Sequence, residues 1–271
     1  MKLNLYEKAL PPELSWRDRL RETREAGFDG LEMSVDETDE RLKRLEWNDA
    51  EREALLAACR SEGLPIRSMC LSGNRKYPLG SEKTEVESRG MEILRRAIDL
   101  SAALGIRIIQ LAGYDVYYEE TSSPATRERF LRNLRKGAAA AASCGVILAL
   151  ETMETPFLNT VEKGMYYVRQ VASPYLQIYP DIGNLYNGTE DVGKDLRCGK
   201  GHIAAAHLKE TVPGVFRNRR FGDGQVDFRM IVPVLRELDV EYFTAEFWYD
   251  GGEGWREELR RVNAFLRQFM T

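Results

Sequence analysis

Residues 144–151 of the chain read CGVILALE, and this stretch decides the fold that we expect. A helix that starts at Ser123 and Pro124 is expected to end at Gly145, because glycine readily adopts the left-handed conformation that ends many helices. Residues 146–151 then form an apolar run without alternating polar residues, which is typical of a strand buried on both faces. The stretch therefore predicts a parallel sheet covered by helices.

The same order of helix, glycine, apolar strand and loop occurs four times, with the closing glycines at Gly27, Gly63, Gly105 and Gly145. The second half of the chain continues it less regularly. The expected strands are residues 3–6, 30–34, 65–71, 107–112, 146–151, 176–180, 203–206 and 241–246. The expected helices are residues 15–26, 48–61, 84–104, 124–144, 159–171, 191–198, 228–238 and 255–269. Ser15 with Asp18 and Thr84 with Glu87 resemble capping boxes at two of the helix starts.

Eight strands and eight helices in 271 residues are typical of a (β/α)8 barrel. We therefore expect an α/β protein, a single TIM barrel domain that spans residues 1–271. A doubly wound open sheet is the alternative. That fold would favour a glycine-rich phosphate loop after the first strand, and residues 6–13, YEKALPPE, contain no glycine.

The composition excludes several classes of function. The formal charge is −4 and the basic residues form no stripe, so we expect no nucleic-acid partner. No apolar run approaches the length of a membrane span, and we expect no membrane partner. The four cysteines form no CxxC pair, which argues against a zinc ribbon and a disulfide framework. They fit a reducing compartment, and we expect a cytoplasmic protein.

Reactive side chains follow the apolar strands. Both histidines of the chain lie in residues 201–210, GHIAAAHLKE, where we expect His207 to follow a short strand. Glu151, Asp181 and Glu246 also stand at strand ends, and a barrel carries its site at the carboxyl ends of its strands. Three carboxylates and one imidazole predict a site for a divalent cation such as Mn²⁺, Mg²⁺ or Co²⁺. The alternative is that the acidic residues cap the following loops or helices.

Further polar residues near the same rim are candidates for binding a substrate. Arg217 lies in a basic loop with Arg219 and Arg220, and guanidinium groups match phosphate oxygens well. A solvated loop is the alternative explanation for these arginines. The candidate substrate-binding residues are Glu32, Asn74, Asn184, Lys209 and Arg217.

Long strings of the sequence resemble one known family, the L-ribulose-5-phosphate (L-xylulose-5-phosphate) 3-epimerases of ascorbate utilisation. The strings include GFDGLEMSVDETDERL at 27–42, MCLSGNRKYPLGSE at 69–82, YPDIGNLYNG at 179–188 and HLKETVPGVFRNRRFGDGQVDF at 207–228. The resemblance covers nearly the whole chain. It implies a xylose-isomerase-like barrel and an isomerase that interconverts the two pentose phosphates.

The resemblance also implies how the site works. Two glutamates, an aspartate and a histidine would hold the divalent ion, with Zn²⁺ as a further possibility, and the motifs place them at Glu151, Asp181, His207 and Glu246. The two glutamates, Glu151 and Glu246, would be the catalytic acid–base pair that inverts C3 through a metal-stabilised enediolate. The partner would be a small sugar phosphate, and we expect a homodimer.

Three other functions stay open at this point. The chain resembles barrels that include a 3-epimerase or isomerase of another ketose or ketose phosphate. An endonuclease-IV-like DNA repair enzyme is a second possibility, but its three-metal site would require more histidines than two. The third is a non-catalytic barrel that binds a sugar phosphate.

Overall fold

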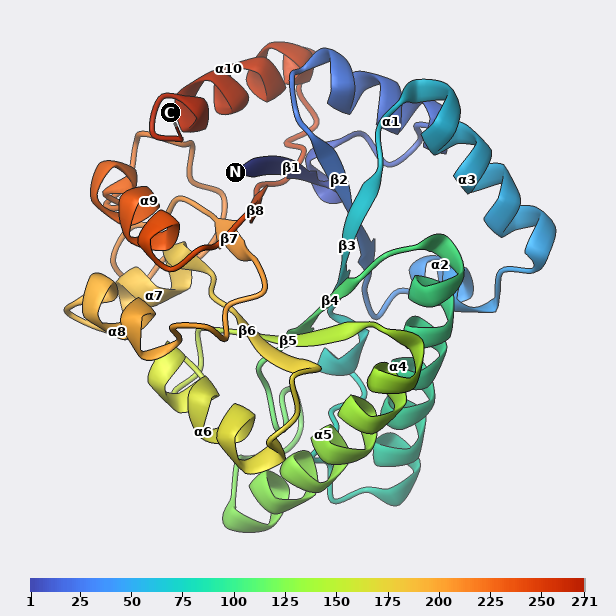
Figure 1. The fold of residues 1–271 in the computed structure, drawn as a ribbon, viewed down its shortest axis with the longest axis vertical. Helices are drawn as coiled ribbons and strands as arrows, with labels where there is room; N and C mark the ends of the chain where they lie inside the picture. The colour runs from blue at the N-terminus through green and yellow to red at the C-terminus, as the bar shows by residue number, and fades with distance from the viewer. Residues whose placement is uncertain (271) are drawn as a thin grey trace.

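The computed structural model describes residues 1–270 and contains eight parallel strands in one sheet, surrounded by a ring of helices (Figure 1). The strands are β1 (Lys2–Tyr6), β2 (Gly30–Val35), β3 (Ile66–Leu71), β4 (Ile108–Ala112), β5 (Ile147–Glu151), β6 (Leu176–Tyr179), β7 (Ala206–Leu208) and β8 (Tyr242–Ala245). Their order in the sheet is β6-β5-β4-β3-β2-β1-β8-β7. The prediction of a barrel is confirmed, and the doubly wound alternative is wrong.

Two isolated bridges join the edge strands β6 and β7 and nearly close the barrel. One bridge pairs Ile178 with Ile203, and the other pairs Asp181 with His207. The backbone N–H of His207 donates to the carbonyl of Pro180 at 3.0 Å. The last seam of the barrel therefore runs directly beside two of the candidate metal ligands.

The helices lie outside the sheet. They are α1 (Trp16–Glu25), α2 (Asp39–Leu42), α3 (Asp49–Glu62), α4 (Thr84–Leu104), α5 (Pro124–Cys144), α6 (Val161–Val171), α7 (Ile182–Gly188), α8 (Val192–Cys198), α9 (Phe228–Glu237) and α10 (Trp255–Arg267). Gly63, Gly105 and Gly145 end α3, α4 and α5 in the left-handed conformation, with φ values of 63°, 71° and 66°. The glycine signal in the sequence is thus confirmed. Among residues 1–270, no helix is long and apolar enough to cross a membrane.

The buried apolar residues form one large cluster and two small ones, since alternate strand residues face the helices and the barrel interior. Residues such as Leu3, Met33 and Leu150 are fully buried in the large cluster between sheet and helices. A smaller cluster contains Ile108, Ala149, Tyr179 and Ala205. The Tyr179 hydroxyl of this inner cluster donates to Glu32 at 2.8 Å, so the cluster borders the polar site described below.

Three local predictions need correction. The seventh strand runs from Ala206 to Leu208 and not over residues 203–206, because continuous pairing with β8 begins only at Ala206. His207 is therefore inside the strand. Helices α2 and α7 were not expected, since both are short. Helix α7 begins at Asp181, whose side chain accepts a hydrogen bond from the backbone N–H of Asn184. Thr84 is not an N-cap, because Lys83 occupies that position and makes no side-chain cap.

Candidate metal centre and active site

Four side chains from the carboxyl ends of β5 to β8 meet in one cluster. Glu151 ends β5, Asp181 is the N-cap of α7, His207 lies in β7 and Glu246 directly follows β8. Each offers one ligand atom, and these atoms all lie within 4.8 Å of one another. All four residues are buried. We call these four residues the acidic cage.

The imidazole of His207 has two distinct sides. Nδ1 faces the cage, at 2.7 Å from Glu151 Oε1, 3.7 Å from Glu246 Oε2 and 4.0 Å from Asp181 Oδ2. Nε2 lies 2.7 Å from Glu32 Oε1, on β2. A histidine that ligates a metal commonly bonds its second nitrogen to a carboxylate, which fixes the ring orientation. Nδ1 is therefore the nitrogen available to an ion.

Glu32 is held from several directions inside the barrel. Its Oε2 accepts hydrogen bonds from Ser68 Oγ at 2.6 Å and from the Tyr179 hydroxyl at 2.8 Å. The side chain is completely buried, and it does not line the cleft described below. This placement differs from the substrate contact that we expected, since both oxygens already have protein partners.

Lys209 lies inside the acidic cage. Its Nζ is 2.5 Å from Asp181 Oδ2 and 3.2 Å from Glu246 Oε2, and it donates to Asn184 Oδ1 at 2.9 Å. The lysine is 5% exposed. Asn184 in turn donates through Nδ2 to the carbonyl of Thr152 at 2.8 Å. Lys209 and Asn184 therefore form a bonded pair against the cage.

The charges of the cage change the pKa values of its members in different directions. Burial alone would raise the pKa of Glu246, but the positive charges of Lys209 and His207 lower it to about 2. Burial raises the pKa of Asp181 well above its usual range, against the opposing charge of Lys209. Burial also raises the pKa of Glu151. Like charges so close together cannot all be ionised without compensation.

The cage fits a divalent ion. Asp181 Oδ2 and Glu246 Oε2 are buried and face Lys209 Nζ, at 2.5 Å and 3.2 Å. Three carboxylates and one imidazole are suitable ligands for Mn²⁺, Mg²⁺ or Co²⁺, and also match the ligand types of catalytic zinc sites. Glu151 is oriented from outside the cage, because Gln110 Nε2 donates to its Oε2.

A cleft of about 530 Å³ opens above the cage. Its walls include both glutamates of the cage together with Asn184, Lys209 and Arg217. The Arg217 guanidinium lies 5.3 Å from the ring centroid of Trp248, which also lines the cleft.

Asn74 is placed elsewhere. It does not line the cleft, and its Nδ2 donates to the carbonyls of Tyr77 at 3.1 Å and Gly90 at 3.2 Å. These bonds fasten the loop after β3 to α4. The placement supports a structural role more than the substrate contact that we expected.

Two cleft residues were missed in the sequence. Lys8 lines the cleft two residues after the end of β1, and Trp248 lines it two residues after Glu246. Arg75, one of the polar residues that the sequence places after strand ends on the same rim, also lines the cleft and lies 5.5 Å from the ring centroid of Tyr117. Their positions after strand ends were a usable signal, because the same rule identified the cage.

Comparisons with known proteins agree with this architecture. The family model described as xylose isomerase-like TIM barrel matches residues 20–268. L-ribulose-5-phosphate 3-epimerase UlaE from Escherichia coli (strain SE11) is 44% identical over 270 residues, which cover 99% of this chain and 95% of that protein. The protein of the same name from Shigella sonnei (strain Ss046) is 48% identical with the same coverage.

Solved structures share the fold at lower identity. D-psicose 3-epimerase from Clostridium cellulolyticum H10, solved with D-tagatose, superposes with a TM-score of 0.85 at 18% identity, covering 100% of this chain and 99% of that one. A structure of L-ribulose 3-epimerase superposes with a TM-score of 0.80 at 20% identity, covering 99% of this chain and 93% of that one. The close sequence relatives make the chain an enzyme of the isomerase class. Since the family model spans most of its length, the chain belongs to the xylose isomerase-like TIM barrel family.

Proposed function

We propose that the chain is a divalent-metal-dependent 3-epimerase that interconverts L-ribulose 5-phosphate and L-xylulose 5-phosphate. The substrate comes from the relatives named L-ribulose-5-phosphate 3-epimerase, at 44% and 48% identity over nearly the whole chain. The observation that carries the proposal is the acidic cage, which lies at the base of a cleft of about 530 Å³.

Inversion at C3 requires removal of a proton from one face and delivery to the other. A bound divalent ion would stabilise the negative charge that develops on the sugar oxygens. Glu151 and Glu246 reach the cleft from different strands, β5 and β8, and both line it. In the proposed reaction one glutamate takes the C3 proton, and the other donates a proton to the opposite face of the planar enediolate.

The surrounding residues prepare these groups for the reaction. Glu32 holds the His207 ring through Nε2, so that Nδ1 faces the acidic cage, where it would bind the ion. Gln110 orients Glu151, and Lys209 with Asn184 orients Asp181 and Glu246. Arg217, which is exposed on the cleft wall, is the proposed contact for the substrate phosphate.

The proposal extends to the state of the enzyme. We propose a single domain that works as a homodimer in the cytoplasm, with Mn²⁺, Mg²⁺ or Co²⁺ as the working ion. Static light scattering on the purified chain tests the dimer.

The test of the proposed function is proton NMR in D2O with each pentose phosphate, with and without Mn²⁺. We expect interconversion together with loss of the C3 proton signal, and no reaction after treatment with EDTA. Turnover of free L-ribulose but not of its 5-phosphate would contradict the proposed substrate. Full activity in a preparation shown by elemental analysis to be metal-free would contradict the role of the cage.

A further inference from the structure

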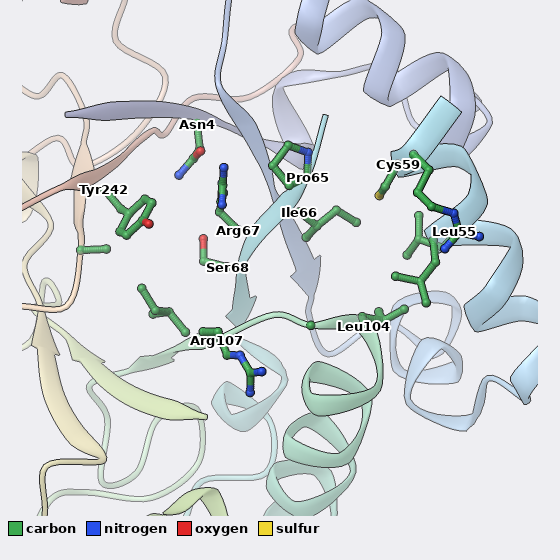
Figure 2. A pocket seen from close by; sticks show the side chains of 15 residues that line it. Asn4, Leu55, Cys59, Pro65, Ile66, Arg67, Ser68, Leu104, Arg107 and Tyr242 are labelled. Carbon is green, nitrogen blue, oxygen red and sulfur yellow. The ribbon is translucent and has the colours of Figure 1, made fainter. Parts of the chain in front are cut away.

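A second cavity lies at the end of the barrel opposite to the cleft, where the strands begin. Its volume is about 270 Å³ (Figure 2). Asn4 of β1, Arg67 of β3 and Tyr242 of β8 line it, together with Leu55 of α3. No member of the acidic cage is among its lining residues. The cavity is therefore separate from the proposed active site.

One end of this cavity is polar. The Arg67 guanidinium lies 5.9 Å from the ring centroid of Tyr242 and forms no ion pair within residues 1–270. Arg67 Nε, a hydrogen-bond donor, is buried without a partner in the part of the chain that the structure describes; the unpaired atom of Asn4 is Oδ1, an acceptor, on a side chain that is 1% exposed. An unpaired buried polar group costs about 1–3 kcal/mol, and it usually has an explanation such as a bound molecule.

The other end of the cavity is apolar. Leu55 and Leu104 face Ile66 there, and Figure 2 shows this group on one side and Asn4, Arg67 and Tyr242 on the other. A ligand that fits both ends must carry a negative head and a short hydrocarbon tail. The volume corresponds to about nine water molecules of liquid, which suits an acid of five or six carbons.

We propose that this cavity binds a small aliphatic carboxylate. The carboxylate accepts hydrogen bonds from the Arg67 guanidinium, and the tail packs among Leu55, Ile66 and Leu104. A guanidinium forms strong bonds with carboxylates because both groups are planar and charged. The proposal assigns a site independent of the epimerase reaction.

Isothermal titration calorimetry on the full, metal-loaded chain tests the ligand class with 4-methylpentanoate, its neutral amide and inorganic phosphate. We expect the carboxylate to bind at least tenfold more tightly than the amide, which lacks the charge, and than phosphate, which lacks the tail. Equal binding of phosphate, or no binding of 4-methylpentanoate, would overturn the assignment.

The location of the ligand in this cavity is tested by substituting two arginines that line it, one without a hydrogen-bond partner among the described residues and one with partners. Arg67→Met removes the unpaired guanidinium and is expected to weaken binding at least tenfold. Arg107→Met is the matched control, because Arg107 lines the same cavity but its Nη1 donates to the carbonyls of Cys144 and Gly145, each at 3.4 Å. Equal loss in both variants would contradict the polar contacts proposed.

A third measurement needs no substitution. Cys59 is a free cysteine that lines the apolar end of the cavity. We expect 4-methylpentanoate to slow the alkylation of Cys59 in the wild-type chain, measured by peptide mass spectrometry, and to leave Cys198 unaffected. Alkylation of Cys59 at an unchanged rate in saturating ligand would place the ligand elsewhere and refute the site.

Discussion

Lys209 Nζ lies 2.5 Å from Asp181 Oδ2, within the group of side chains that would hold a metal ion. The lysine also contacts Glu246 Oε2 at 3.2 Å, and both carboxylates are almost completely buried. A buried carboxylate requires a nearby positive charge, because desolvation disfavours its ionised form. Lys209 therefore supplies a fixed positive charge to the cage.

Lys209→Met is expected to destabilise the metal-free protein and to strengthen metal binding. Loss of a buried ion pair typically costs about 3–5 kcal/mol, so the Tm without metal should fall by roughly 5–15 °C. Without the ammonium, the affinity for Mn²⁺ should rise about tenfold or more, since one repulsive charge is removed. Differential scanning fluorimetry and metal titration measure both quantities.

The control for this substitution is Lys8→Met, since Lys8 lines the same cleft but pairs with Asp36 at 2.5 Å. It should leave Mn²⁺ affinity unchanged. A Lys209→Met protein with normal metal affinity, normal Tm and a defect only towards phosphorylated sugars would instead identify Lys209 as a phosphate contact.

Glu151→Gln and Glu246→Gln should each lower the rate of epimerisation by about 10²–10⁴-fold, the usual contribution of a general acid or base. Glutamine keeps one oxygen for the ion but removes the basic carboxylate. Each variant should still exchange the C3 hydrogen of one epimer with D2O, and the two variants should prefer opposite epimers. NMR in D2O measures this exchange, and a wild-type rate in either metal-loaded variant would exclude that glutamate as acid or base.

Glu32→Gln should weaken metal binding by about 10–100-fold, the usual effect of removing a partner that orients a ligating histidine. The substituted residue does not line the cleft, so the KM for substrate at saturating Mn²⁺ should change little. Tyr179→Phe is the matched control, because it removes one hydrogen bond to Glu32 but keeps the contact between Glu32 and His207. Equal losses in the two variants would argue against the positioning of His207.

Arg217→Met should lower kcat/KM at least tenfold for L-ribulose 5-phosphate and leave the activity on free L-ribulose unchanged. The guanidinium stands over Trp248 at the cleft wall, where a phosphate dianion could reach it. Arg220→Met is the control, since Arg220 pairs with Glu258 at 3.4 Å. Parallel loss of activity on both sugars in Arg217→Met would show that Arg217 does not recognise the phosphate.

Asp36 should make the stability depend on pH in the acid range. Although burial alone would raise it, hydrogen bonds from Lys8 and Thr38 lower the pKa of Asp36 to about 2. A lowered pKa in the folded state means that the stabilisation is present above about pH 4 and is lost as the pH falls towards 2. The free energy of unfolding, measured with urea, should therefore fall less steeply between pH 5 and pH 2 for Asp36→Asn than for the wild type.

The sequence predicted the barrel and the positions of the cage because both depend on local patterns. Glycine ends helices through its own backbone, and Glu151 and Glu246 stand at the ends of apolar runs. Glu32 does not line the cleft, and it lies three residues before the end of β2. Its side chain therefore lies one layer deeper, among groups from β3 and β6. Such depth depends on the register between strands, which no single strand reveals.

Lys209 and Asn74 illustrate a second limit. Both follow strands, as the candidate substrate contacts do, yet their side chains turn to protein partners. Lys209 turns to carboxylates contributed by β8 and the start of α7, while Asn74 bonds to carbonyls of Tyr77 and Gly90. A flexible side chain can bond to many different partners, and which of them lie within reach depends on how the strands pack together in the folded barrel.

The backbone bridge between Asp181 and His207 connects ion binding with closure of the barrel between β6 and β7. These two residues both fasten the final seam of the barrel and offer atoms to an ion. Any free energy released when the ion binds is added to the free energy that keeps β6 and β7 together. Binding of an ion would therefore oppose opening of this seam, and amide hydrogen exchange at residues 203–208 would slow when the ion is added.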